Sequence, residues 1–475
     1  MRMYDTISGM AIHNAAFFGA IAFLLGVAAA SIGIAFGVYA AALAALGIGT
    51  VLVLRRFAAD VTRAAIVVLV CVAVLGYFYF HLFAAATVPS TADKTFEALV
   101  ARDPKRGDRQ ELTLSLRSPA AGSVVWYAPR YPAYAYGDVL RFSPEASVSL
   151  RYGRYVLRGD AVRTAEGAGN RLRGALYAFK RALVGILEAA LPREKAALLA
   201  GLTVGERGEF SDEFKEALRV SGTTHIVALS GYNIAIVALA AGALFSKFLA
   251  RRPRFLVTLS VIAAFVIATG AEASVVRAGI MGAILLLAKD SGRIYSLRNA
   301  ITATAFIMAL VDPSVLIFDL GFQLSFLALL GIVFLVPRIE PLVLRIRGVP
   351  AVLKEHLATT AAAQLAVTPL LLMSFGSVSL FSLPANVLIL GTVPLTMALG
   401  FLAGFAGLLH GALAGLFALP AGILLSYQIG TIEFFGRLPQ AGLAFIPSWF
   451  VVLPYYALLV FWVRWKRKPP HAAIG

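Results

Sequence analysis

Stretches of about 20 mainly apolar residues recur along the whole chain, and they constrain its fold more than any other feature. A helix of that length crosses the hydrocarbon core of a membrane. Of the 475 residues, 60% are hydrophobic, and the mean hydropathy is +0.82, whereas a soluble globular domain is roughly half apolar. The sequence therefore predicts a polytopic α-helical membrane protein.

Three of these stretches precede residue 90, and the charges between them set the direction of the chain. Arg55, Arg56 and Arg63 lie between the second and the third stretch, and basic loops stay in the cytoplasm. We therefore expect residue 90 to lie outside, and we expect the first helix to be retained because no convincing cleavage site follows it. The predicted helices cover residues 14–34, 36–54 and 64–86.

The same rule orders the rest of the chain. We expect the basic segments at residues 247–254, 289–298, 338–354 and 464–468 to lie in the cytoplasm. About nine further helices satisfy these assignments, which makes about 12 in all. Several are shorter than a bilayer, which indicates broken or tilted helices. They are predicted near residues 225–246, 255–270, 275–288, 299–311, 320–337, 355–374, 385–408, 413–432 and 446–463.

Residues from about 95 to 165 have a different pattern, in which apolar residues alternate with polar ones. Five short strands with glycine turns in about 70 residues fit a small β-barrel such as the OB-fold. A three-stranded sheet or a sandwich fits the same pattern. The strands are predicted at residues 112–116, 124–128, 139–142, 148–150 and 155–157.

An amphipathic helix is predicted after the strands and is expected to lie on the membrane surface. Its apolar residues are Leu172, Leu176, Phe179, Leu183, Ile186 and Leu187, while Arg173, Lys180 and Arg181 face elsewhere. The chain is thus divided into residues 1–88 (transmembrane helices), 89–168 (OB-like extracytoplasmic domain), 169–222 (interfacial helices), 223–465 (helical channel domain) and 466–475 (basic cytoplasmic tail).

Residues 93–195 carry 18 Lys and Arg against 11 Asp and Glu, and this positive excess lies on the side where the positive-inside rule does not explain it. Cations beside aromatic rings are typical of surfaces that bind single-stranded nucleic acid, where phosphates are neutralised and bases stack. A domain that rests on anionic lipid headgroups has the same composition. The candidate DNA-binding residues are Arg130, Arg151, Tyr152, Arg154 and Tyr155.

Polar residues at the ends of the predicted membrane helices form a second group of candidates. Such groups are costly in lipid unless they are paired or face a cavity. The predicted topology places them at outer helix ends, where they form either a polar vestibule or independent helix caps. Glu272 is expected to pair with Arg277, and Gln323 is the nearest candidate donor to Asp319. The vestibule candidates are His225, Ser230, Asn233, Glu272, Arg277, Asp319, Gln323 and Asn386.

Several common chemistries have no signature in the sequence. There is no Gly-Lys-Ser/Thr phosphate loop, and the six histidines are scattered without metal-ligand spacing. The single cysteine, Cys71, lies in an apolar stretch, so no intramolecular disulfide forms. We therefore expect neither a metal site nor another cofactor, and no enzymatic activity of the ATPase or nuclease kind.

Longer motifs between residues 201 and 326 resemble the ComEC-type competence family of DNA-internalisation proteins. The motifs are Gly201-Leu-Thr-Val-Gly-Glu-Arg-Gly, Gly222-Thr-Thr-His-Ile-Val-Ala-Leu-Ser-Gly, Ala273-Ser-Val-Val-Arg-Ala and the run from Asp312 to Phe326. The resemblance implies that the β segment is an OB-like domain and that the helical region conducts DNA. His225, Ser230, Arg277, Asp319 and Gln323 match the family's motif positions.

Two departures from the family pattern affect what the resemblance implies. Many members have a second histidine where this chain has Asn233. Many also carry a C-terminal metallo-β-lactamase-like domain, and the sequence up to Lys468 contains none. We therefore expect a separate nuclease to degrade one DNA strand.

The sequence therefore predicts an inner-membrane channel that takes single-stranded DNA into the cytoplasm during natural transformation. Its expected partners are single-stranded DNA, membrane lipids, a cytosolic DNA-translocating ATPase, a surface DNA receptor and the nuclease, and homo-oligomerisation stays open. The alternative is a membrane enzyme or transporter for an envelope lipid or polymer, in which His225, Glu272 and Asp319 handle protons or ions. A membrane anchor that only binds is a third hypothesis.

Overall fold

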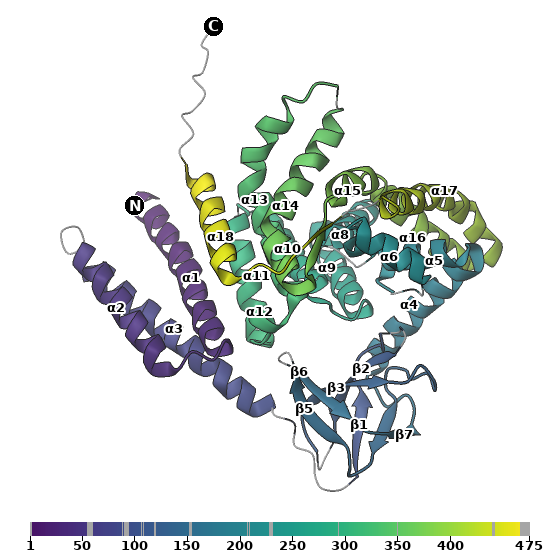
Figure 1. Ribbon diagram of the computed structural model, residues 1–475, viewed down its shortest axis with the longest axis horizontal. Helices are drawn as coiled ribbons and strands as arrows, with labels where there is room; N and C mark the ends of the chain where they lie inside the picture. Colours follow the sequence, from purple (N-terminus) through teal and green to yellow (C-terminus); the bar gives the residue numbers. More distant parts are fainter. Residues whose placement is uncertain are drawn as a thin grey trace. The chain divides into compact units, whose positions relative to one another are not determined.

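The computed structural model is mainly helical, with a β domain after the third helix (Figure 1). The chain divides into two compact units, Met1–Ala182 with Ser230–Gln323 and Leu183–Leu229 with Leu324–Gly475. Helices α4 (Arg171–Ala190) and α13 (Leu320–Val343) each begin in the first unit and end in the second. The structure describes residues 2–54, 60–87, 89, 95–105, 107, 109–117, 120–151, 154–206, 208, 210–227, 231–292, 294–348, 350–438 and 442–465.

The first unit combines the β domain with eight further helices. They are α1 (Arg2–Ser31), α2 (Phe36–Leu54), α3 (Asp60–Thr87), α8 (Gly231–Ser246), α9 (Arg251–Ala268), α10 (Ala273–Asp290), α11 (Leu297–Val311) and α12 (Val315–Phe318). Helices α1 and α3 pack so closely that a Cβ at Gly26 would overlap the carbonyl oxygen of Ala73. Small residues at such crossings are typical of membrane helices.

The second unit is built from helices and one two-stranded sheet. Its helices besides the ends of α4 and α13 are α5 (Arg193–Val204), α6 (Asp212–Val220), α7 (Thr224–Val227), α14 (Ala351–Phe375), α15 (Ser382–Leu390), α16 (Val393–Leu409), α17 (Gly411–Gly436) and α18 (Trp449–Arg464). Strands β8 (Ser377–Ser379) and β9 (Gly442–Ala444) pair antiparallel. Helices α15 and α16 meet at a bend of 49°.

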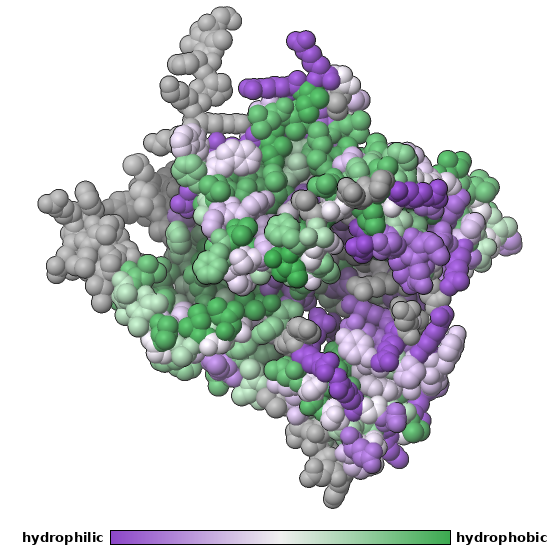
Figure 2. Space-filling model, viewed as in Figure 1, coloured by the Kyte–Doolittle hydropathy of each residue, from purple (hydrophilic) through white to green (hydrophobic). Residues whose placement is uncertain are grey.

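The helices have the surface of a membrane protein. Large apolar side chains such as Leu82, Leu239 and Ile423 are more than 70% exposed, and Figure 2 shows hydrophobic residues spread over the helices and hydrophilic residues gathered over the β domain. Among the described residues, five helices are long and apolar enough to cross a membrane, or six if α15 and α16 form one bent span. The chain is therefore a polytopic membrane protein, and a total of about 12 spans remains a prediction.

Each predicted helix has a counterpart in the structure, although several bounds differ. The stretch predicted at residues 385–408 is divided into α15 and α16, and the backbone turns at residues 391 and 392. The sequence pattern missed this break because the apolar run continues through it. The stretch predicted at residues 225–246 contains α7 and α8, and residues 228–230 between them lie outside the described residues.

The β domain contains all five predicted strands and two more. Its sheet has the order β5-β6-β3-β2-β1-β4-β7. Alternate residues of the first strands are buried in one core, which includes Phe96, Leu112, Leu114, Trp126 and Phe142. The strands are β1 (Phe96–Val100), β2 (Gln110–Leu116), β3 (Ser123–Ala128), β4 (Val139–Phe142), β5 (Ser147–Arg151), β6 (Arg154–Arg158) and β7 (Ala161–Ala165).

The connection between β4 and β5 requires the sheet to curl. These strands are five positions apart in the sheet order, which is about 24 Å in a flat sheet. The chain from Phe142 to Ser147 spans at most about 17 Å. The edge that carries β4 must therefore bend toward β5. Strands β3 and β6 are parallel, and the OB-like arrangement with a closed barrel remains a prediction.

The first half of α4 packs against the β domain, which differs from the predicted amphipathic face. Lys180 is buried rather than on the outer side, and its Nζ lies 2.6 Å from Asp103 Oδ2. The Tyr177 ring is also buried, 5.0 Å from the Tyr136 ring, whereas Phe179 is 41% exposed. The β domain supplies polar partners that helical spacing alone does not reveal.

Candidate nucleic-acid interface

The strand register defines an outer face of the β domain, opposite its core. Leu157 is buried in the core, so its neighbours on β6, Arg154, Val156 and Arg158, point outward. Arg151 of β5 is directly opposite Arg154, and opposite residues of an antiparallel pair share a face. Three arginines of one hairpin therefore lie on the outer face.

The outer face continues across β3 and β2. Val125 pairs with Val156, and Tyr127, two residues along β3, pairs with Glu111 of β2. Tyr127 is 46% exposed, so its ring is available beside the arginines. Lys105 forms an isolated β-bridge with Glu111. We call the surface formed by Lys105, Glu111, Tyr127, Arg151, Arg154 and Arg158 the basic face.

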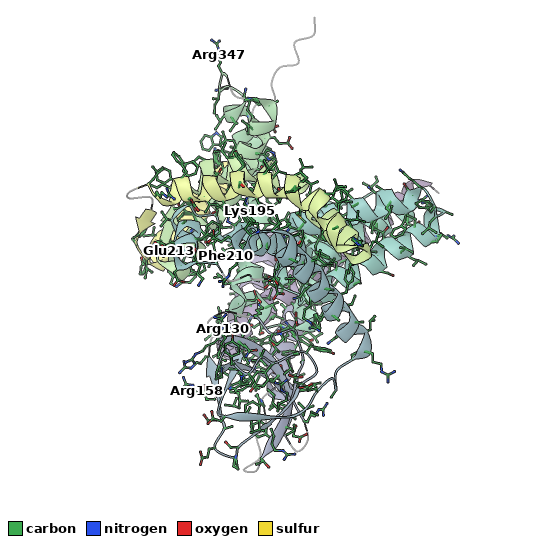
Figure 3. All side chains as sticks on the ribbon, turned by 90° about the vertical axis from the view of Figure 1, so that its right-hand side faces the viewer. Arg130, Arg158, Lys195, Phe210, Glu213 and Arg347 are labelled. Atoms are coloured by element: carbon green, nitrogen blue, oxygen red, sulfur yellow. The ribbon has the colours of Figure 1, made fainter. Side chains whose placement is uncertain are left out.

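A second exposed group lies in the segment between β3 and β4. Arg130 lies over the Tyr131 ring, 5.8 Å from its centroid, and that ring is 74% exposed. Figure 3 shows Arg130 and Arg158 on the surface of the β domain. The structure thus places three predicted arginines, Arg130, Arg151 and Arg154, on the surface, together with Arg158, which the sequence analysis did not select.

The aromatic residues of the β domain are divided between surface and core. Tyr155 packs against the core cluster, and Trp126 and Tyr134 are members of it. Tyr127 and Tyr131 are instead the exposed rings. Tyr152 lies outside the described residues. The alternation of strand residues between the two faces of a sheet was the signal that Tyr155 and Arg154 point to opposite sides.

The basic face contacts the N-terminal end of α13 within the first unit. Arg154 Nη2 lies 3.5 Å from Asp319 Oδ2, and Arg154 Nη1 lies 3.8 Å from Glu111 Oε1. The guanidinium is 54% exposed, and the two carboxylates are 25% and 29% exposed. Solvent therefore reaches this cluster.

A second ion pair joins the β domain to the start of α10. Lys105 Nζ lies 3.2 Å from Glu272 Oε1. Glu272 is the N-cap residue of α10, where its charge is favourable to the helix dipole. The structure pairs Glu272 with Lys105, and the expected pairing of Glu272 with Arg277 stays a prediction. A Cβ at Gly231 would lie 3.1 Å from Arg277 Nη2, so Arg277 lies against the start of α8.

Asp319 and Gln323 are close, but their side chains have separate partners. Asp319 Oδ1 accepts a hydrogen bond from the backbone N–H of Phe322 at 2.9 Å. Gln323 Nε2 donates to the carbonyl oxygens of Leu316 at 3.1 Å and Ile317 at 2.7 Å. The expectation that Gln323 donates to Asp319 is therefore wrong, because its amide donates to two backbone carbonyl oxygens of α12 instead.

Two other candidates, His225 and Asn386, belong to a polar cluster in the second unit. The His225 imidazole hydrogen-bonds the backbone of Gly222, and Ser382 Oγ lies 3.4 Å from the Gly222 carbonyl oxygen. Ser382 Oγ donates to Gln364 Oε1 at 2.8 Å and accepts from Asn386 Nδ2 at 3.1 Å. Three chain segments, the one before α7, α14 and α15, thus meet around one hydroxyl.

The remaining vestibule candidates are less informative. Asn233 is buried on α8, and Ser230 lies outside the described residues. The structure brings Asp319 and Glu272 to the β domain in the first unit, and it brings His225 and Asn386 together in the second. Metal ligation has no support, since no group of three His, Cys, Asp or Glu residues suited to a metal ion occurs in the described part.

Fold and site together define a polytopic membrane protein whose helix ends contact a basic β domain. A family model described as Competence protein matches residues 202–469, more than half of the chain. The chain therefore belongs to the competence protein family, which confirms the resemblance seen in its motifs.

Comparison with individual proteins gives one informative relative. ComE operon protein 3 of Bacillus subtilis (strain 168) is 26% identical over 236 residues, which cover 48% of this chain and 29% of that protein. The match thus spans less than a third of the relative's length. No solved structure matches the chain.

Proposed function

We propose that this protein acts in DNA uptake for competence, as an inner-membrane channel that passes single-stranded DNA into the cytoplasm. The observation that carries the proposal is that a competence-family chain presents the basic face against the ends of α10 and α13. Arg151, Arg154 and Arg158 supply cations for phosphates, and Tyr127 supplies an exposed ring for base stacking. A strand held there lies beside the helical part of the same unit.

A protein path is required because a polyanion does not cross hydrocarbon. Charged groups within a membrane need water, counter-charges or backbone dipoles around them. A broken helix provides such groups, and the bend between α15 and α16 is of that kind. We infer that this break lines part of the DNA path.

The proposal includes the placement and the partners of the chain. Residues 90–220 lie outside the cytoplasm, and the β domain there forms an OB-like barrel that receives the strand from a surface DNA receptor. A separate nuclease degrades the other strand. A cytosolic ATPase pulls the bound strand inward, since the sequence has no nucleotide-binding phosphate loop of its own.

Uptake of labelled DNA tests this function. Cells with a clean deletion of the gene should keep surface-bound and nuclease-resistant extracytoplasmic DNA but should lose labelled DNA from the cytoplasm, and the wild-type gene should restore it. Normal cytoplasmic DNA in the deletion strain would reject the channel. An altered envelope lipid or polymer with unchanged DNA uptake would instead support the transporter hypothesis.

A further inference from the structure

We propose that Lys105 and Arg154 form a phosphate-binding site for the incoming strand, which the carboxylates of Glu272 and Asp319 occupy until DNA displaces them. This inference rests on the proposed function and deepens it. It assigns a binding role to Lys105 and a competing role to the two acidic residues. The chemical class of the ligand is a pair of phosphodiester groups on one flexible strand.

The two cations belong to one local site on the basic face. Lys105 and Glu111 form a β-bridge, with backbone N···O distances of 3.1 and 3.0 Å. Residues paired in this way lie about 5.5 Å apart at Cα and point to the same side of the sheet. Glu111 is also 3.8 Å from Arg154. Lys105 is therefore paired through its backbone with the residue whose carboxylate Arg154 contacts.

The present partners of these cations have the chemistry of the proposed ligand. Arg binds carboxylate and phosphate oxygens through the same N–H groups, and Lys binds both as a point charge. Asp319 and Glu272 each offer one oxygen, at 3.5 and 3.2 Å. Lys105 and Arg154 thus bind phosphate oxygens once these carboxylates have moved away.

Separating these carboxylates from Lys105 and Arg154 costs little free energy for either partner. Ion pairs exposed to this degree contribute little stability, and salt screens them further. The carboxylates also keep favourable surroundings without the cations. Glu272 is at the N-cap of α10, and Asp319 Oδ1 still accepts the Phe322 N–H. The carboxylates of Glu272 and Asp319 therefore occupy the phosphate-binding site weakly and reversibly.

Binding of fluorescent single-stranded DNA to the full chain in lipid nanodiscs tests the competition. Asp319→Asn keeps the helix cap but releases Arg154, so it should bind several-fold more tightly than wild type. Arg154→Gln should weaken binding and lower the log-log salt slope by about 0.7. In the Arg154→Gln background, Asp319→Asn should have no effect on DNA affinity, because the guanidinium that it would release is already absent.

A matched control separates this site from a general change in charge. Glu97→Gln also removes one carboxylate, from an ion pair with Arg141 at 3.0 Å within the β domain. It should leave the affinity for DNA near wild type. Equal tightening by Glu97→Gln, or weaker binding by Asp319→Asn, would overturn the proposal.

Carbodiimide cross-linking gives a second readout on native residues. The reagent joins an amine to a carboxylate that touches it, so mass spectrometry should find Lys105 linked to Glu272. Single-stranded DNA should suppress this link and should spare the buried pair of Lys180 and Asp103. A chain that binds no DNA would reject the proposed function itself. A chain that binds DNA with the Lys105 to Glu272 link unchanged would reject this inference alone.

Discussion

Gly222 and Ser382 approach so closely that a Cβ added at Gly222 would lie 2.6 Å from the Cβ of Ser382. The backbone of Gly222 also has φ of +69°, which L-residues with a side chain adopt at a cost of about 1–2 kcal/mol. This contact explains why the Gly-Thr-Thr-His motif begins with glycine. It also fixes the place where the segment before α7 meets the start of α15.

Gly222→Ala should therefore destabilise the second unit. We expect a lower melting temperature in detergent and less protein in the membrane, because backbone strain and the clash with Ser382 add together. Gly415→Ala is the matched control, since a Cβ at Gly415 meets nothing within 4 Å, and alanine favours the helix. Equal stability of the two variants would contradict this explanation of the motif.

Ser382 is expected to contribute to the stability of the second unit through its hydrogen bonds with Gln364 and Asn386. Ser382→Ala leaves Gln364 Oε1 and Asn386 Nδ2 without this partner, which should cost about 1–3 kcal/mol in the buried site. Asn386→Leu should cost less in the Ser382→Ala background than in wild type, because the amide there has already lost its partner. Ser426→Ala, which removes a hydroxyl bonded within α17, should have little effect on the melting temperature.

The sequence predicted elements better than their contacts. Apolar runs and alternation located the helices and five strands, because these patterns reflect local burial. Strands β1 and β7 were missed, although Phe96, Ala98 and Val100 do alternate toward the core. The position of the break between α15 and α16 was also missed, since hydropathy does not change where the backbone turns.

The candidate site was predicted in residue type but not in arrangement. Arg154 and Asp319 were selected independently, yet their ion pair depends on how the β domain packs on α13, which no local pattern encodes. Tyr155 was assigned to the surface because it neighbours Arg154, but alternate residues of a strand face opposite sides. The buried Lys180 escaped notice because its partner, Asp103, lies in another segment.

The ion pair of Lys180 and Asp103 should anchor α4 to the β domain. Both side chains are largely buried, 8% and 12% exposed, so Asp103→Asn removes this carboxylate from beside a buried ammonium. Loss of a buried partner costs about 3–5 kcal/mol. Hydrogen exchange of β1 and the first half of α4 should accelerate. Arg181→Gln, at the more exposed cation near Asp103, should change exchange much less, and similar rates in both variants would contradict the anchor.

Topology is testable through single cysteines in a Cys71→Ala background. The predicted orientation places Arg158 outside and Arg347, between α13 and α14, in the cytoplasm. Both side chains are exposed (Figure 3), so Arg158→Cys should react with a membrane-impermeant maleimide in intact spheroplasts. Arg347→Cys should react only after lysis. Reaction of both before lysis would invalidate the assignment of residues 90–220 to the outside and, with it, the direction of DNA movement.

The basic face should account for DNA binding by the full chain in nanodiscs. Arg151→Ala and Arg158→Ala each remove an exposed cation from this face, so each should lower the log-log salt slope by about 0.7. Tyr127→Ala should weaken binding with little change in slope, because stacking on a ring releases no counterions. Arg173→Ala, which removes an exposed cation from α4, is the charge-matched control and should leave the slope unchanged. If all four variants bind alike, or if wild type prefers anionic vesicles to single-stranded DNA, the basic face serves lipid headgroups instead.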